Sequence, residues 1–174
     1  IIRNINADAV IAVYPFTPQP AITHAVLTAA EMPVFSGVGG GITSGARVVN
    51  LAMDAEALGA TAVVVNAPTS NECIRRLKEV IDIPVVVTVA RMDTDVKARL
   101  AAGADILNVS AAENTAPLVR RIRSEFPQAA IIATGGSTEE TILRTIEAGA
   151  NGITYTPPTS AALFRELMVK YRGD

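Results

Sequence analysis

Side chains suited to acid–base chemistry are few in this sequence, and the best placed ones follow stretches that are expected to be strands. Glu113 has no evident capping or pairing role, so we expect it to act as a general base that removes a proton next to a carbonyl group. Arg91 can hold a carboxylate or a phosphate, and with Asn108 it can stabilise the oxyanion that such a step develops. Asp93 is instead expected to cap a helix that starts at Thr94. The predicted catalytic residues are therefore Glu113, Arg91 and Asn108.

The run Thr134-Gly135-Gly136-Ser137 is the strongest candidate for binding an anion. Two glycines at the end of a strand let the backbone approach a phosphate closely, and the amide groups at the start of the next helix supply donors. The alternative is that Ser137 and Glu140 form a capping box, which needs no ligand. We favour phosphate binding by all four residues of the run, because a cap alone does not require two successive glycines.

Further polar side chains lie at the ends of other strands. One set of alternating positions in each strand is apolar and should face helices, so the other set should point inward. That inward set includes Asn66, Asn108, Ser110 and Thr156. Buried amides and hydroxyls must be satisfied by one another, by water or by a ligand. We therefore expect Asn66, Ser110 and Thr156 to bind substrate, with a hydrated interior as the alternative.

The elements that must position these residues alternate regularly along the chain. Short apolar, β-branched runs that are typical of buried parallel strands occur at residues 9–14, 33–37, 62–66, 84–89, 105–110, 130–134 and 152–156. Amphipathic stretches that are typical of helices follow them at residues 20–31, 44–58, 70–81, 94–102, 116–126, 137–148 and 160–171. No change of composition divides the chain, so residues 1–174 are expected to form one α/β domain.

An internal repeat sets the architecture. Segments that begin Leu58-Gly59-Ala60, Ala102-Gly103-Ala104 and Ala148-Gly149-Ala150 align without gaps, and strands introduced by proline lie between them. Two βα units therefore make one repeat. This order predicts a parallel (β/α)8 barrel in which seven βα units are present and the first strand is missing from the chain. An open seven-stranded sheet and a naturally shortened barrel are the alternatives. In such barrels the active site occupies the carboxyl ends of the strands.

Composition narrows the range of partners. A formal net charge of −2 and an aromatic content of 4% argue against nucleic acid, and no apolar run is long enough for a membrane span. The single cysteine suits a cytoplasmic protein. We expect a small phosphorylated or carboxylated metabolite as the partner, and a homo-oligomer is compatible with the sequence. No cofactor or metal site is expected, although Mg²⁺ bridged by Glu113 and a substrate phosphate stays an alternative.

From Ala102 to Thr159 the order of elements resembles the carboxyl-terminal half of phosphate-binding TIM barrels. The run Thr134-Gly135-Gly136 makes it most similar to the keto-deoxy-phosphogluconate aldolases, in which this motif follows the seventh strand. The resemblance implies a phosphate loop at these residues and a Schiff-base lysine on the sixth strand. That strand, residues 105–110, carries no lysine, and all three lysines of the chain, Lys78, Lys97 and Lys170, fall in helical stretches. An imine mechanism is therefore not expected unless the missing first strand supplies the amine.

The sequence leaves more than one function open. The favoured hypothesis is an aldolase-like enzyme of lyase or isomerase type that acts without an imine on a sugar-derived metabolite. A barrel that senses a metabolite without catalysis, resembling the glycerol-phosphate antiterminators, is the first alternative. A hydrolase that uses a water molecule held by Glu113 is the second.

Overall fold

The computed structural model describes residues 6–13, 18–39 and 41–173. Within these ranges seven strands form one sheet in chain order, and every neighbouring pair is parallel. The strands are β1 (Val10–Ala12), β2 (Val34–Gly39), β3 (Ala62–Val65), β4 (Val85–Val89), β5 (Ile106–Val109), β6 (Ala130–Thr134) and β7 (Gly152–Thr154). Because every pair is parallel, all carboxyl ends lie at one edge of the sheet.

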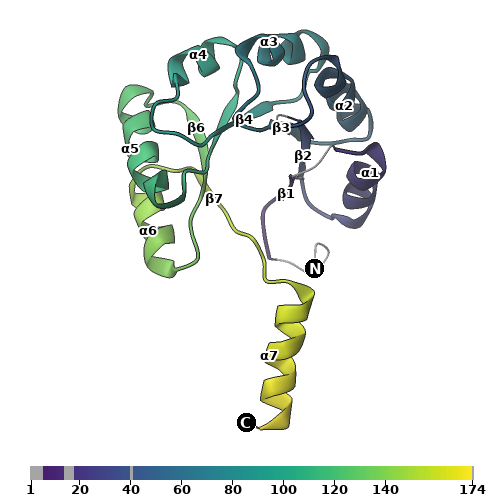
Figure 1. The fold of residues 1–174 in the computed structure, drawn as a ribbon, viewed down its shortest axis with the longest axis vertical. Helices are drawn as coiled ribbons and strands as arrows, with labels where there is room; N and C mark the ends of the chain where they lie inside the picture. Colours follow the sequence, from purple (N-terminus) through teal and green to yellow (C-terminus); the bar gives the residue numbers. More distant parts are fainter. Residues whose placement is uncertain (1–5, 14–17, 40, 174) are drawn as a thin grey trace.

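A helix follows each strand. The helices are α1 (Pro20–Ala29), α2 (Ala46–Ala57), α3 (Asn71–Val80), α4 (Val96–Ala101), α5 (Thr115–Glu125), α6 (Glu139–Glu147) and α7 (Ser160–Arg172), and the 3₁₀ turn η2 (Ala112–Asn114) precedes α5. Figure 1 shows α1 to α6 on the outside of the curved sheet and α7 extending away from it. The sheet is a nearly closed parallel barrel that lacks one βα unit between β7 and β1, which confirms the predicted architecture.

The two faces of the strands contact different clusters of side chains. Val63, Val65 and Leu107 belong to the large cluster formed with the helices, whereas Val64 and Val86 form a small cluster on the inside of the barrel. The alternation predicted from the sequence is therefore correct in the central strands. No residue of α7 is buried, so the described core ends with α6.

The last strand is shorter than predicted. β7 ends at Thr154, and the side chain of Tyr155, predicted to face a helix, is 62% exposed. Because α7 does not pack over this part of the chain, nothing covers Tyr155, and Thr156 lies beyond the strand. Tyr14, the predicted end of the first strand, lies outside the described residues.

Two copies of the repeat carry the same contact at the amino ends of the strands. In each, a long basic side chain packs on the glycine, and we call this contact a clamp. Gly103 and Gly149 have φ angles of 109° and 106°, in the positive range that glycine adopts readily at the ends of helices. The stem of Lys78 lies over Gly103, and the stem of Arg123 lies over Gly149. A side chain at either glycine would collide with the long basic residue, so the glycine is needed for both its backbone and its contact.

Each basic residue also holds the polar residue that follows its glycine. Lys78 Nζ donates to Asp105 Oδ2 at 2.9 Å, and Arg123 Nη2 donates to Asn151 Oδ1 at 2.8 Å. The same carboxylate and amide oxygens accept an amide at the start of the neighbouring strand, from Val85 in β4 and from Ile131 in β6.

Arg123→Met should lower the stability of the fold by about 2 kcal/mol, measured by urea denaturation, because a charged donor to several carbonyl oxygens is lost. Its guanidinium donates to the carbonyls of Pro127, Ala129 and Gly149 in addition to Asn151. Arg120→Met, at an exposed position of the same helix, is the matched control and should change the stability by less than about 0.5 kcal/mol. Equal stability of the two variants would show that the clamp contributes nothing.

Candidate functional site

Four polar side chains face the barrel interior near the carboxyl ends of the strands, in two hydrogen-bonded pairs. Asn108 Nδ2 donates to Thr88 Oγ1 at 3.3 Å across β4 and β5, and Thr154 Oγ1 donates to Thr134 Oγ1 at 3.2 Å across β6 and β7. The other amide atom of Asn108, Oδ1, is buried and has no hydrogen-bond partner. An unsatisfied buried acceptor costs about 1–3 kcal/mol, so a hydrogen-bond donor from a water molecule or a ligand would be stabilised at this oxygen.

The other predicted inward residues occupy different surroundings. Asn66 and Ser110 are half-buried and directly follow β3 and β5, so the structure brings them to the same edge as Asn108. Thr156 is exposed and lies two residues past β7, outside this group.

The glycines of the predicted phosphate loop are both required by their surroundings. A Cβ at Gly135 would lie 2.8 Å from side-chain atoms of Ile142 and of Ile153. Gly136 has a φ of 82°, and a Cβ there would lie 2.5 Å from the hydroxyl of Thr141. The close turn from β6 into α6 thus needs both glycines, whether or not an anion binds to its backbone.

The cap of α6 differs from the predicted one. Thr138, not Ser137, is the N-cap, and its side chain accepts from the amide of Thr141 at 3.2 Å while the Thr141 hydroxyl accepts from the amide of Thr138. Glu140 pairs with Arg144 instead, because its position in the first turn faces the next turn of the helix. Ser137 is therefore exposed and not engaged in the cap, at the entrance to the helix.

A pocket of about 390 Å³ opens between the loops after β4 and β5. It is lined by Ala90, Arg91, Met92, Asp93, Ala111 and Asn114. Arg91 was predicted from the sequence as a site residue, whereas Met92, Ala111 and Asn114 were not. Their position directly after a strand end is the signal that could have identified them.

Glu113 lies near this pocket but does not line it. It is exposed on the short turn η2, and the preceding residue, Ala112, has a φ of 50°. A residue with a side chain in this left-handed region costs about 1 kcal/mol, which the surrounding structure must offset. The backbone strain thus falls immediately next to the predicted general base.

Arg91 and Asp93 form an ion pair at the rim of the pocket. Arg91 Nε lies 2.9 Å from Oδ1 of Asp93, and Nη2 lies 2.7 Å from Oδ2. The hydrogen bonds to Arg91 lower the pKa of Asp93, and the same contact raises the pKa of Arg91. Asp93 is therefore ionised at neutral pH and does not serve as a general acid.

This ion pair explains why the predicted helix cap is wrong. The carboxylate of Asp93 is occupied by Arg91, so it does not accept the amides of the helix. α4 begins after Asp95, whose carboxylate accepts from the amide of Ala98 at 2.9 Å. Thr94, the predicted first helical residue, stays in the loop before the cap.

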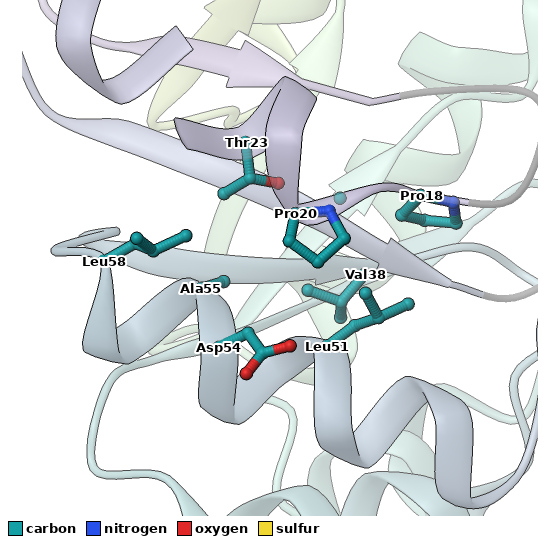
Figure 2. Close-up of a pocket in the computed structure, with 9 residues that line it drawn as sticks. Pro18, Pro20, Thr23, Val38, Leu51, Asp54, Ala55 and Leu58 are labelled. Carbon is teal, nitrogen blue, oxygen red and sulfur yellow. The ribbon is translucent and has the colours of Figure 1, made fainter. Parts of the chain in front are cut away.

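A second hollow lies away from the strand ends, in the helical layer. Figure 2 shows it between α1 and α2, where Pro20 and Thr23 on one helix lie opposite Leu51 and Ala55 on the other. It has no room for a water-sized molecule. We therefore interpret it as helix packing and not as a ligand site.

In the part of the chain that the structure describes, no three or more His, Cys, Asp or Glu side chains gather where they could hold a metal ion. No described helix combines the length and the hydropathy that a membrane span requires. The lysines Lys78, Lys97 and Lys170 lie on α3, α4 and α7, so none is on a strand.

Solved structures show the same fold. The chain is similar to the native KDPGal structure, at 22% identity over 82% of this chain and 67% of that one, with a TM-score of 0.58. It is also similar to dihydrodipicolinate synthase from Acinetobacter baumannii complexed with pyruvate, at 17% identity over 86% and 58% of the two chains, with a TM-score of 0.67.

Phosphonopyruvate hydrolase in complex with oxalate and Mg²⁺ gives a TM-score of 0.70, at 16% identity over 89% of this chain and 66% of that one. No protein-family model matches the sequence, and a comparison with curated proteins gave no match. The chain spans 51–67% of the length of the first structures that it matches. The comparisons confirm the resemblance to aldolase-like TIM barrels at the level of the fold.

Arg91→Gln should raise the pKa of Asp93 toward its ordinary value, because the two hydrogen bonds that favour the ionised carboxyl are lost. Carboxyl carbon NMR during a pH titration measures this change, with Arg120→Gln as the control. Since the pKa in the folded state is the lower one, the ion pair stabilises the fold above the unfolded pKa. That contribution is lost as the pH falls through the folded pKa. An unchanged pKa in Arg91→Gln would mean that the pair is absent in solution.

Proposed function

We propose that this chain is the barrel of an enzyme of lyase or isomerase type that acts on a small phosphorylated or carboxylated, sugar-derived metabolite. The observation that carries the proposal is the buried, unpartnered Oδ1 of Asn108 at the inner carboxyl end of β5. Active sites of parallel barrels form at this end of the strands. The pocket of about 390 Å³ between the loops after β4 and β5 has the size of a small-molecule site.

In this proposal the residues divide the chemistry among them. Glu113 removes a proton next to a carbonyl group. Arg91 and the second N–H of Asn108 Nδ2, whose first donates to Thr88, stabilise the oxyanion that results, and the free Oδ1 of Asn108 accepts from a hydroxyl of the substrate. Thr134, Gly135, Gly136 and Ser137 hold the phosphate at the start of α6. Asn66 and Ser110 contact the substrate from neighbouring strands, and Thr156 does so from the loop after β7. No described strand carries a lysine, so the proposed roles assign no imine to the residues of this chain.

The proposed removal of a proton by Glu113 assigns no step to a metal ion. The similar phosphonopyruvate hydrolase was solved with Mg²⁺. The test in this chain is the donor set: Glu113 is exposed, and it belongs to no described group of three or more potential ligands. A site between Glu113 and a substrate phosphate would therefore depend on the substrate for most of its ligands.

The exposure of Glu113 favours a second candidate. A general base usually lies within hydrogen-bond reach of its substrate, and Glu113 does not line the pocket. A sensor that binds the same class of metabolite without turnover requires no base. Variants of Ser137 and Glu113 distinguish the enzyme from the sensor.

Ser137→Asp should weaken the binding of inorganic phosphate and of phosphorylated keto acids by about tenfold, because a negative charge then stands where the phosphate binds. The change keeps the fold, since Ser137 is exposed and a carboxylate is favourable near a helix start. Thermal-shift titration measures the effect, with Ser124→Asp on the exposed face of α5 as the control for charge. Equal binding by both variants would contradict the phosphate loop.

Glu113→Gln should lower turnover of a substrate identified by thermal-shift screening by about 100-fold, with binding retained, because the general base is removed. Steady-state kinetics measures the change. Glu147→Gln, at an exposed position of α6, is the control and should keep full activity. Full activity of Glu113→Gln would refute the role of the base, and ligand binding with no turnover by the unmodified protein would favour the sensor.

A further inference from the structure

The guanidinium of Arg91 is already engaged by a carboxylate of its own loop. Its Nε and Nη2 donate to the two carboxylate oxygens of Asp93 at 2.9 and 2.7 Å. Two parallel N–H···O bonds to one carboxylate make the geometry in which arginine binds the acid group of a ligand. Asp93 thus presents to Arg91 the same pair of oxygens that a ligand carboxylate would present.

The backbone of this loop is held independently of the ion pair. Arg121, on α5, donates to the carbonyl oxygens of Met92 and Thr94. The amide of Thr94 in turn donates to the carbonyl of Arg91 at 3.2 Å. The side chain of Asp93 can therefore leave Arg91 while the loop keeps its shape.

The ion pair is also easy to displace. The side chains of Arg91 and Asp93 are 76% and 69% exposed, so solvent screens their attraction and exchange requires little desolvation. Both residues line the pocket of about 390 Å³, and Ala90, Met92 and Ala111 give it an apolar wall. A small acid with an apolar or carbonyl-bearing body fits such a pocket.

We propose that Asp93 is an internal substitute for a ligand carboxylate, and that small carboxylic acids bind by taking its place on Arg91. No covalent bond changes in this exchange: one carboxylate leaves the guanidinium and another arrives. The inference rests on the proposed function and adds two points to it. Arg91 recognises a carboxylate, and Asp93 sets the affinity by competing with it.

Asp93→Asn tests the exchange directly. With pyruvate as the probe, the variant should bind about tenfold more tightly than the unmodified protein, as expected if Asp93 occupies Arg91 about nine-tenths of the time. Nitrogen-15 NMR of the Arg91 Nε–H group and of the backbone amides of Met92 and Asn114 measures the dissociation constant. Arg91→Gln should abolish the response of these amides.

Asp82→Asn is the matched control. It removes the same unit of charge from an exposed position between α3 and β4, whereas the pocket lies past the other end of β4, and it should change the affinity less than twofold. Equal affinities of Asp93→Asn and Asp82→Asn would overturn the proposal. So would the absence of any amide shift up to about 50 mM pyruvate in both the unmodified protein and Asp93→Asn.

Inorganic phosphate in place of pyruvate tests the chemical class. A gain for pyruvate that clearly exceeds the gain for phosphate supports recognition of a carboxylate, and an equal or larger gain for phosphate overturns it. The titration involves no turnover. Its failure is therefore distinguishable from failure of the proposed function, which the Ser137 and Glu113 variants decide.

Discussion

Parallel pairing is the constraint on which the rest of this structure depends. Two parallel neighbours cannot be joined by a tight turn, so each strand must be followed by a helix that returns the chain to the starting edge. Repeated from β1 to β7, this requirement brings the carboxyl end of every strand to one edge of the sheet and the amino end of every strand to the other. Residues as distant in sequence as Asn66 and Thr154 therefore lie at the same edge of the sheet.

The sequence predicts the helices and strands well because hydrophobic periodicity, and the glycines and prolines that separate elements, are local properties of the chain. The alternation of Val63, Val64 and Val65 between two clusters follows from strand geometry alone. β2 is a partial exception, since it continues to Gly39 through an irregular register next to β3. A stretch rich in glycine carries little strand signal, and only the neighbouring strand shows that pairing continues to Gly39.

The candidate site is harder to predict because its side chains are placed by contacts between loops. Asp93 was predicted to cap the next helix, but in the structure that helix begins at Val96 with Asp95 as its cap, and Asp93 pairs with Arg91. The left-handed conformation of Ala112 likewise has no local signal, since alanine does not favour it. Sequence reasoning therefore identifies the edge of the barrel and the type of residue there, but not which side chains meet.

The repeated clamps of Lys78 and Arg123 lie at the amino ends of the strands, whereas the candidate site lies at the carboxyl ends. Both clamps join amino ends of strands to the ends of preceding helices, and neither includes a residue of the pocket or of the turn at Gly135. Substitutions in the loops at the carboxyl ends of the strands thus leave these hydrogen bonds intact. Such a barrel can acquire a new ligand preference without a matching loss of stability. Substitutions that change the ligand fall at the carboxyl ends of the strands, and the stabilising contacts at the amino ends stay the same.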